Sequence, residues 1–277
     1  MGYIEKTDNC GTNHNMNFYL KTTLFAALAL LLTSHAGCKP HAAANRTEAA
    51  VSLDTFHLYD QARHRDVPVA VYQTNGKRNR HQKMVLVSHG YGENSGDAYL
   101  YYTFLTEFLA RQGYFVVSIQ HELPTDSLIP MTGIPQVVRR PFWERGADNI
   151  LFVIKQIKQK YPDRGFEEIT LIGHSNGGDM SALFPQKYPG IVDKIITFDN
   201  RRMALPRSSR PRVYSLRSSD QTADAGVLPT AEEQALYGMK IVALADMPHN
   251  SMCDQATAAQ RQEINRHVLA FLQEKKH

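Results

Sequence analysis

Residues 169–178 have the sequence ITLIGHSNGG, and this stretch decides the fold. The β-type run Ile169–Ile172 leads into a Gly-x-Ser-x-Gly pattern, and small residues lead out of it toward a helix-like segment. A serine on a sharp turn between a strand and a helix leaves no room for side chains two positions to either side. Glycine removes that clash and tolerates unusual backbone angles. The pattern predicts that Ser175 lies on such a turn as a reactive residue; a glycine-rich turn whose serine caps the next helix is the alternative.

The rest of the composition is that of one globular domain. The chain has 277 residues, of which 43% are hydrophobic and 21% charged, which is enough for one sizeable core. The formal net charge is +4 and the basic residues are scattered, so nucleic acid is not an expected partner. The sequence has no Cys-x-x-Cys or His-Glu-x-x-His pattern. We therefore expect no metal site and no cofactor.

The N-terminus has the pattern of an export signal. Lys21 precedes a short apolar run, residues 24–32, and small residues lead to Cys38. A basic region, an apolar region and a small-residue cleavage site predict a signal peptide over residues 1–37. Because Met16 is a more typical start, residues 1–15 are interpreted as an extension.

The segment Ala36-Gly37-Cys38 resembles a bacterial lipoprotein signal, in which the cysteine is lipidated and becomes the new N-terminus. We therefore expect an exported protein that is lipid-anchored through Cys38 to the bacterial envelope, at the outer membrane or the periplasmic face. Secretion after cleavage near residues 42–44 is the alternative. Residues 38–50 are expected to form a tether, and residues 51–277 to form one domain.

From residue 51 onward, strand-like and helix-like segments alternate. Residues 123–141 hold four prolines and little periodicity, which predicts a loop or a small cap-like insertion. Pro185 is expected to end or kink its helix. The alternation predicts an α/β fold with a mainly parallel, doubly wound sheet covered by helices on both faces. Strands are expected at 51–59, 67–73, 84–88, 114–120, 169–172, 194–198, 212–216 and 239–245, and helices at 99–112, 147–161, 179–188 and 257–275.

The pattern around Ser175 resembles the nucleophile elbow of α/β-hydrolases, in which serine, acid and histidine follow one another along the chain. A serine hydroxyl is a weak nucleophile and needs a general base, which an acid in turn orients. His249 follows the last predicted strand and is the expected base. His174 is expected to point into the fold, His89 to brace the loop after the third strand, and His121 to line the site or the cap.

Three aspartates are candidates for the acid, because each follows a predicted strand. Asp199 comes directly after residues 194–198, Asp220 follows residues 212–219, and Asp224 lies four residues further on. The pattern alone slightly favours Asp220 or Asp224. Each could instead be a turn aspartate that accepts bonds from nearby backbone N–H groups.

An oxyanion formed during acyl transfer needs two fixed N–H donors. The backbone N–H of Asn176 lies at the start of the helix after Ser175, where the helix dipole favours negative charge. The second donor is expected from the loop after the third strand, most simply the N–H of Tyr91 within His89-Gly90-Tyr91-Gly92.

Three blocks of sequence carry a closer resemblance. Residues 60–69, 87–92 and 173–178 are similar to the platelet-activating-factor acetylhydrolase and dienelactone-hydrolase-like branch of the α/β-hydrolases, over roughly residues 52–275. In the acetylhydrolases the acid follows the strand after the nucleophile helix. This resemblance implies that Asp199, 24 positions after Ser175, is the acid, with Asp220 next. Dienelactone hydrolases proper use a cysteine nucleophile, so the serine here argues against that chemistry.

The expected function is hydrolysis of carboxylic esters, with an acyl ester or lipid-like substrate, through an acyl-enzyme. An amidase or peptidase on the same fold and a catalytically silent binding lipoprotein are the alternatives. Five arginines flank the cap or follow Asp199 and predict either a site for an anionic substrate group or surface ion pairs: Arg139, Arg140, Arg145, Arg201 and Arg202. Cys253 is expected to be a small buried residue and not a nucleophile.

Overall fold

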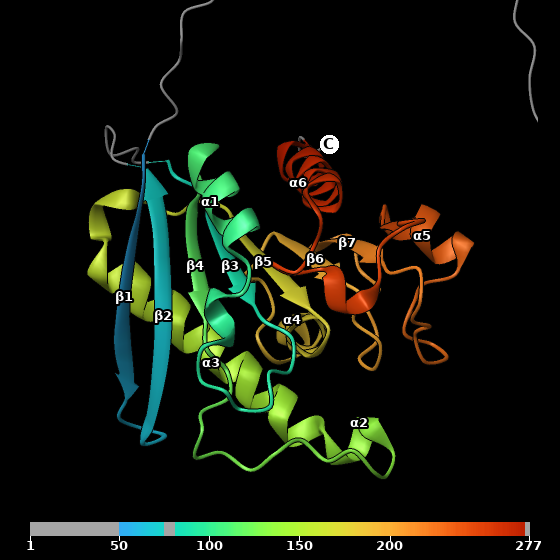
Figure 1. The fold of residues 1–277 in the computed structure, drawn as a ribbon, viewed down its shortest axis with the longest axis horizontal. Helices are drawn as coiled ribbons and strands as arrows, with labels where there is room; N and C mark the ends of the chain where they lie inside the picture. Colours follow the sequence, from blue (N-terminus) through green and yellow to red (C-terminus); the bar gives the residue numbers. More distant parts are fainter. Residues whose placement is uncertain (1–49, 75–80, 275–277) are drawn as a thin grey trace, which may run out of the picture. The chain divides into compact units, whose positions relative to one another are not determined.

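The computed structural model describes residues 50–74 and 81–274 (Figure 1). The predicted signal peptide, Cys38 and nearly all of the predicted tether lie outside these residues. Within the described ranges, no helix combines the length and apolar character that a membrane crossing requires.

The described residues form one eight-stranded sheet with the order β1-β2-β4-β3-β5-β6-β7-β8. Strand β1 pairs antiparallel with β2 and β2 antiparallel with β4, whereas every pairing from β4 to β8 is parallel. The mainly parallel sheet is thus as predicted, with an antiparallel margin. The strands are β1 (Val51–Asp60), β2 (Arg65–Thr74), β3 (Met84–Ser88), β4 (Phe115–Ile119), β5 (Ile169–His174), β6 (Lys194–Phe198), β7 (Arg212–Arg217) and β8 (Lys240–Ala243).

Helices cover both faces of the sheet, as Figure 1 shows. Alternate side chains of a strand point to opposite faces. On β3, Leu86 packs in a core with helices α3 and α4, while Val85 and Val87 pack in a second core with α1 and α6. The helices are α1 (Thr103–Arg111), α2 (Pro135–Val138), α3 (Arg140–Lys160), α4 (Asn176–Lys187), α5 (Ala231–Tyr237) and α6 (Ala258–Gln273). Short 3₁₀ turns are η1 (Ala98–Leu100), η2 (Pro162–Arg164) and η3 (His249–Ser251).

The predicted start of one helix was wrong. Helix α3 begins at Arg140, well before the predicted residue 147. Pro141 lies in the first turn of this helix, where a backbone N–H has no acceptor within the helix, so the proline there costs no helical hydrogen bond. Pro185 lies inside α4, which continues two residues further to Lys187, so it does not end the helix; the kink that was the other expectation stays a prediction. The segment that was predicted as a loop or cap contains α2, with Pro135 in its first turn.

Helix α5 was missed, although the sequence contains its start signal. The hydroxyl of Thr230 accepts the N–H of Glu233, and the Glu233 carboxylate accepts the N–H of Thr230. This reciprocal capping box stabilises the first turn of a short helix.

Candidate active site

Ser175 lies between β5 and α4 in a backbone conformation that residues other than glycine rarely adopt, with φ 50° and ψ −116°. The two glycines that flank it, Gly173 and Gly177, are required because other backbone segments pass too close to leave room for a Cβ atom. A Cβ on Gly173 would lie 2.3 Å from the carbonyl oxygen of Gly177, and a Cβ on Gly177 would lie 2.3 Å from that of Ser88. The predicted turn is therefore present. The Ser175 side chain makes no capping bond to α4, which contradicts the alternative that it only caps the helix.

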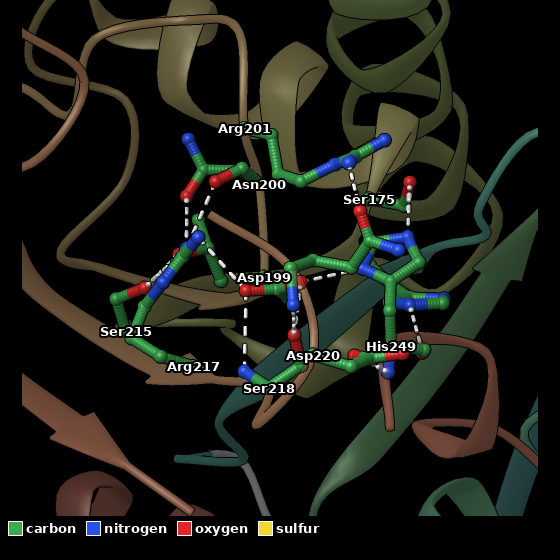
Figure 2. Close-up of polar contacts among 12 residues, drawn as sticks. Ser175, Asp199, Asn200, Arg201, Ser215, Arg217, Ser218, Asp220 and His249 are labelled. Atoms are coloured by element: carbon green, nitrogen blue, oxygen red, sulfur yellow. Dashed lines mark hydrogen bonds and ion pairs between the residues drawn. The ribbon is translucent and has the colours of Figure 1, made fainter. Parts of the chain in front are cut away.

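The loops after β5, β6 and β8 bring Ser175, Asp199 and His249 together (Figure 2). Nε2 of His249 lies 2.9 Å from the Ser175 Oγ, and Nδ1 of His249 lies 2.5 Å from Asp199 Oδ2. The ionised carboxylate can only accept, so Nδ1 carries the proton and Nε2 is free to accept the serine O–H. This is the arrangement of a nucleophile, a base and an orienting acid.

Asp199 is fully buried and is held in its charged form. It lies 2.8 Å from the Arg217 guanidinium and accepts bonds from the hydroxyl and the N–H of Ser218. Burial raises the pKa of Asp199, but the bond from His249, the charge of Arg217 and the bonds from Ser218 outweigh it, so the pKa lies below its usual range. The carboxylate is therefore ionised at neutral pH.

The two other aspartate candidates do not reach the His249 ring. Asp220 Oδ1 accepts the backbone N–H of His249 at 2.7 Å, so it contacts the main chain of that residue. Asp224 pairs with Arg202 and accepts the side-chain amide of Gln136 at 2.9 Å. The sequence pattern alone slightly favoured these two, and the structure brings Asp199 to the ring instead.

Asn176 is the first residue of α4, so its backbone N–H has no acceptor within the helix. Its side chain is clamped from both ends in the interior. Nδ2 donates to Glu122 Oε1 at 2.9 Å, and Oδ1 accepts the indole N–H of Trp143 at 2.8 Å. These bonds fix the backbone that would present the N–H to an oxyanion.

The loop that carries Tyr91 is tied down by the histidine before it. Nδ1 of His89 lies 2.6 Å from the carbonyl oxygen of Gly90, and its Nε2 accepts the N–H of His121 at 3.0 Å. The predicted bracing role of His89 agrees with these contacts. His121 is only 1% exposed, and its Nε2 lies 3.0 Å from the Ser88 Oγ, so it does not open onto the site; the alternative, that it lines the cap, stays a prediction.

A chain of hydrogen bonds joins this loop to the segment of His249. The Gly90 N–H donates to the Tyr102 hydroxyl at 3.0 Å, which lies 2.8 Å from Nδ1 of His174. Nε2 of His174 lies 3.0 Å from the carbonyl oxygen of His249. Burial, and next the nearby His249, lower the pKa of His174 to about 3, so the ring is neutral. It therefore donates to the carbonyl through Nε2 and accepts the Tyr102 O–H through Nδ1.

His174 points into the fold as predicted, whereas Tyr102, Glu122 and Arg217 were not anticipated. No motif marks these three residues in the sequence. Their partners come from distant strands, so only the folded topology places them at the site.

A cavity of about 270 Å³ lies beside the loop after β3, lined by residues that include Tyr91, Tyr102, Asn250 and Cys253. The Cys253 Sγ donates to the carbonyl oxygen of Asn250 at 3.3 Å. Cys253 is only partly buried, so the expectation of a buried residue was wrong. Burial still raises the pKa of its thiol, which keeps the thiol protonated. Across residues 50–74 and 81–274, no group of three or more histidine, cysteine or acidic side chains is placed to hold a metal ion.

Comparisons with known proteins match parts of the chain. The family model described as serine aminopeptidase, S33, matches residues 79–198. A probable serine hydrolase of Drosophila melanogaster is 25% identical over 116 residues, which is 40% of this chain and 34% of that protein. The chain therefore matches about a third of the length of this curated relative.

Solved structures match most of the chain at low sequence identity. A fungal esterase from Rhizomucor miehei has a TM-score of 0.60 at 14% identity, covering 83% of this chain and 84% of its own. A brefeldin A esterase, described as a bacterial homologue of human hormone-sensitive lipase, has a TM-score of 0.58 at 12% identity. The match covers 82% of this chain and 78% of the esterase. A putative dienelactone hydrolase from Klebsiella pneumoniae has a TM-score of 0.54 at 14% identity. The match covers 81% of this chain and 100% of that protein's chain.

Proposed function

We propose that this chain, which has the α/β-hydrolase fold, is a serine hydrolase that cleaves carboxylic esters. The observation that carries the proposal is the continuous hydrogen-bonded series from Ser175 Oγ through the His249 ring to Asp199. The esterases among the similar structures support an ester substrate.

In the proposed reaction, Ser175 Oγ attacks the ester carbonyl while His249 Nε2 accepts the hydroxyl proton. Asp199 stabilises the imidazolium that forms. The C–O bond to the alcohol breaks, and the alcohol leaves with the proton from His249. Water, activated by the same histidine, then releases the acid and restores Ser175.

The backbone N–H groups of Tyr91 and Asn176 are the proposed oxyanion donors. Each such donor contributes about 3 kcal/mol to transition-state stabilisation. The clamp on the Asn176 side chain and the bonds to Gly90 support this role, because fixed donors pay no reorganisation cost during the reaction.

Ser175→Ala tests the proposal directly. We expect hydrolysis of p-nitrophenyl esters, from acetate to palmitate, to fall by about 10⁴-fold or more, because the nucleophile is gone. A fluorophosphonate probe should label the wild type at Ser175 and leave the variant unlabelled. Ser209→Ala, at an exposed serine outside the site, is the matched control and should keep full activity. Retained turnover in Ser175→Ala would contradict the assignment.

The match to the serine aminopeptidase model favours a peptidase or amidase as the second candidate. Both chemistries would use the same three side chains. A panel of aminoacyl p-nitroanilides beside the esters separates them, since an aminopeptidase should have the higher kcat/KM on the amides.

We also propose that the protein is exported and lipid-anchored through Cys38, on the support of the N-terminal sequence pattern alone. Metabolic labelling with a palmitate analogue should mark the wild type. Cys38→Ala should lose both the label and recovery in the membrane fraction.

A further inference from the structure

Three arginines meet where the cap approaches the loop after β6: Arg139, Arg201 and Arg202, named here the arginine cluster. Arg139 directly precedes α3, and the other two follow Asp199 closely. The side-chain amide of Gln136 ties the two segments together, because it donates to the Arg202 carbonyl at 3.2 Å and to Asp224 at 2.9 Å. Burial first, and then the charge of Arg202, lower the pKa of Arg139. The carboxylate of Asp179 opposes this shift, and the charge of Arg201 adds to it, as expected for like charges held close together.

Carboxylates neutralise the cluster only in part. Arg202 pairs with Asp224. Arg139 donates to the carbonyl oxygen of Pro130 at 3.0 Å and to the sulfur of Met131 at 3.4 Å, while Arg201 donates to the amide oxygen of Gln221. In the described part of the chain, neither Arg139 nor Arg201 has a carboxylate within ion-pair distance.

The remaining carboxylate beside the cluster is already committed. Asp179 is buried, and its Oδ1 accepts the backbone N–H groups of Arg202 and Met203 at 3.0 and 2.8 Å. The other cap arginines differ from Arg139 in this respect. Arg140 pairs with Glu144 at 2.8 Å, and Arg145 lies 3.4 Å from Asp126.

The cluster lies on segments that adjoin the proposed reacting centre. Arg201 lies two residues after the proposed triad acid, and the neighbouring Arg202 N–H donates to Asp179 in the first turn of the helix that follows Ser175. The hydroxyl of Tyr91, whose backbone N–H is a proposed oxyanion donor, accepts the N–H of Ile129 at 3.2 Å, so the cap segment that leads to Arg139 contacts the loop after β3. Arg139 and Arg201 therefore lie on segments that adjoin the proposed reacting centre.

We propose that Arg139 and Arg201 bind an anionic group of the substrate, a carboxylate or a phosphate, so that the preferred ester carries a negative charge near the scissile bond. The proposal rests on the proposed esterase function and names its substrate class. Guanidinium groups match the geometry of carboxylate and phosphate oxygens, and such charged hydrogen bonds are among the strong ones in proteins. A bound anion would relieve the repulsion within the cluster.

Matched esters test the proposal on the full chain. The carboxylate arm compares mono-p-nitrophenyl glutarate with its neutral methyl ester. The phosphate arm compares the p-nitrophenyl ester of 3-phosphonopropionate with the same compound whose phosphonate is neutralised as its dimethyl ester. We expect kcat/KM to be about 10- to 100-fold higher for an anionic ester than for the neutral one, as the loss of one charged hydrogen bond implies. The arm with the larger preference identifies the anion.

Arg139→Gln and Arg201→Gln should each remove most of this preference, mainly by raising KM for the anionic ester. Arg140→Gln, which lies on the same helix but pairs with Glu144, is the matched control and should keep the preference. Inorganic phosphate should inhibit the wild type competitively and inhibit the two variants less. Thermal unfolding of each variant verifies that the fold is intact.

Two outcomes would overturn the proposal, and they are distinguishable. Ser175-dependent hydrolysis with equal kcat/KM for charged and neutral esters would overturn the anion subsite and leave the esterase function standing. The absence of all ester hydrolysis, together with no fluorophosphonate labelling, would overturn the proposed function and this inference with it.

Discussion

Asp199 follows β6 directly with φ 53°, a left-handed conformation that aspartate and asparagine tolerate better than most residues. The conformation lets its backbone N–H donate to the Leu216 carbonyl at 2.9 Å, while the carboxylate faces both His249 and Arg217. Asp199 thus joins the C-terminal end of β7 to the imidazole ring. Asparagine tolerates the same left-handed conformation, so its substitution for Asp199 should leave the backbone unchanged.

Asp199→Asn should lower kcat by about 10⁴-fold with little change in fold, because a neutral amide neither stabilises the imidazolium nor selects the same ring tautomer. Asp220→Asn keeps an oxygen that can accept the His249 N–H, so it should cost less than about 10-fold. Steady-state kinetics of the two variants, with Asp224→Asn as a control away from the ring, measure the difference. A larger loss in Asp220→Asn than in Asp199→Asn would assign the acid role to Asp220.

Single residues of the site were predictable to different degrees. The glycine spacing identifies Ser175, and the position after the last strand identifies His249. The spacing of the strands does not distinguish the three aspartates, because each follows a strand. Which carboxylate reaches the His249 ring depends on the path of each loop in the fold, and the sequence pattern does not give that path. Asp199 was predicted only through the resemblance to acetylhydrolases.

At the scale of elements, the Tyr102 hydroxyl connects three segments that meet only in the fold. It lies just before α1, accepts the N–H of Gly90 after β3, and bonds to His174 at the end of β5. Through His174 the same series reaches the carbonyl oxygen of His249 in η3. The loop of the proposed oxyanion donor and the segment of the proposed base therefore share one set of supports.

Tyr102→Phe should weaken the hold on both the loop after β3 and the segment of His249, because both depend on the Tyr102 hydroxyl. The Gly90 N–H and Nδ1 of His174 would lose their buried partner, which lowers the free energy of unfolding by about 1–3 kcal/mol. We also expect kcat to fall more than KM rises, since the displaced loop acts in the transition state. Denaturant unfolding and ester kinetics measure the two effects. Tyr101→Phe removes a hydroxyl that bonds Asp97 on the exposed surface and should change neither quantity appreciably; similar losses in both variants would contradict the supporting role of Tyr102.

Buried strands were the most predictable elements, because their apolar runs are continuous. Helix ends were less predictable where the decisive contact is local polar chemistry. The capping box of α5 and the first-turn proline of α3 both follow known rules, yet each lies in a segment without the apolar periodicity that suggests a helix.

For the whole molecule, the charge state of Asp179 makes stability depend on pH. This carboxyl lies in the first turn of α4, and burial raises its pKa to about 6, against the opposing effect of bonds from Met203 and Arg202. Its pKa in the unfolded chain is the ordinary 3.8. Because the folded state binds this proton more tightly, the stabilisation is complete below about pH 4 and is lost as the pH rises to about 6.

Asp179→Asn should therefore flatten the pH profile of stability. The amide oxygen can still accept the two backbone N–H groups, but the group no longer titrates. Between pH 4 and pH 7 the wild type should lose roughly 3 kcal/mol more unfolding free energy than the variant, from about two pKa units at about 1.4 kcal/mol each. Urea unfolding at several pH values measures the difference, and parallel profiles for the two proteins would contradict the raised pKa.

The position of β8 has a practical consequence. This strand has four residues, pairs only with β7 in the described sheet, and leads into the turn that holds His249. Short edge strands open at a lower free energy than the interior of a sheet. Mild heating or low denaturant should then abolish the proposed ester hydrolysis while circular dichroism still reports an intact protein, so turnover would be the more sensitive measure of sample quality during purification and storage.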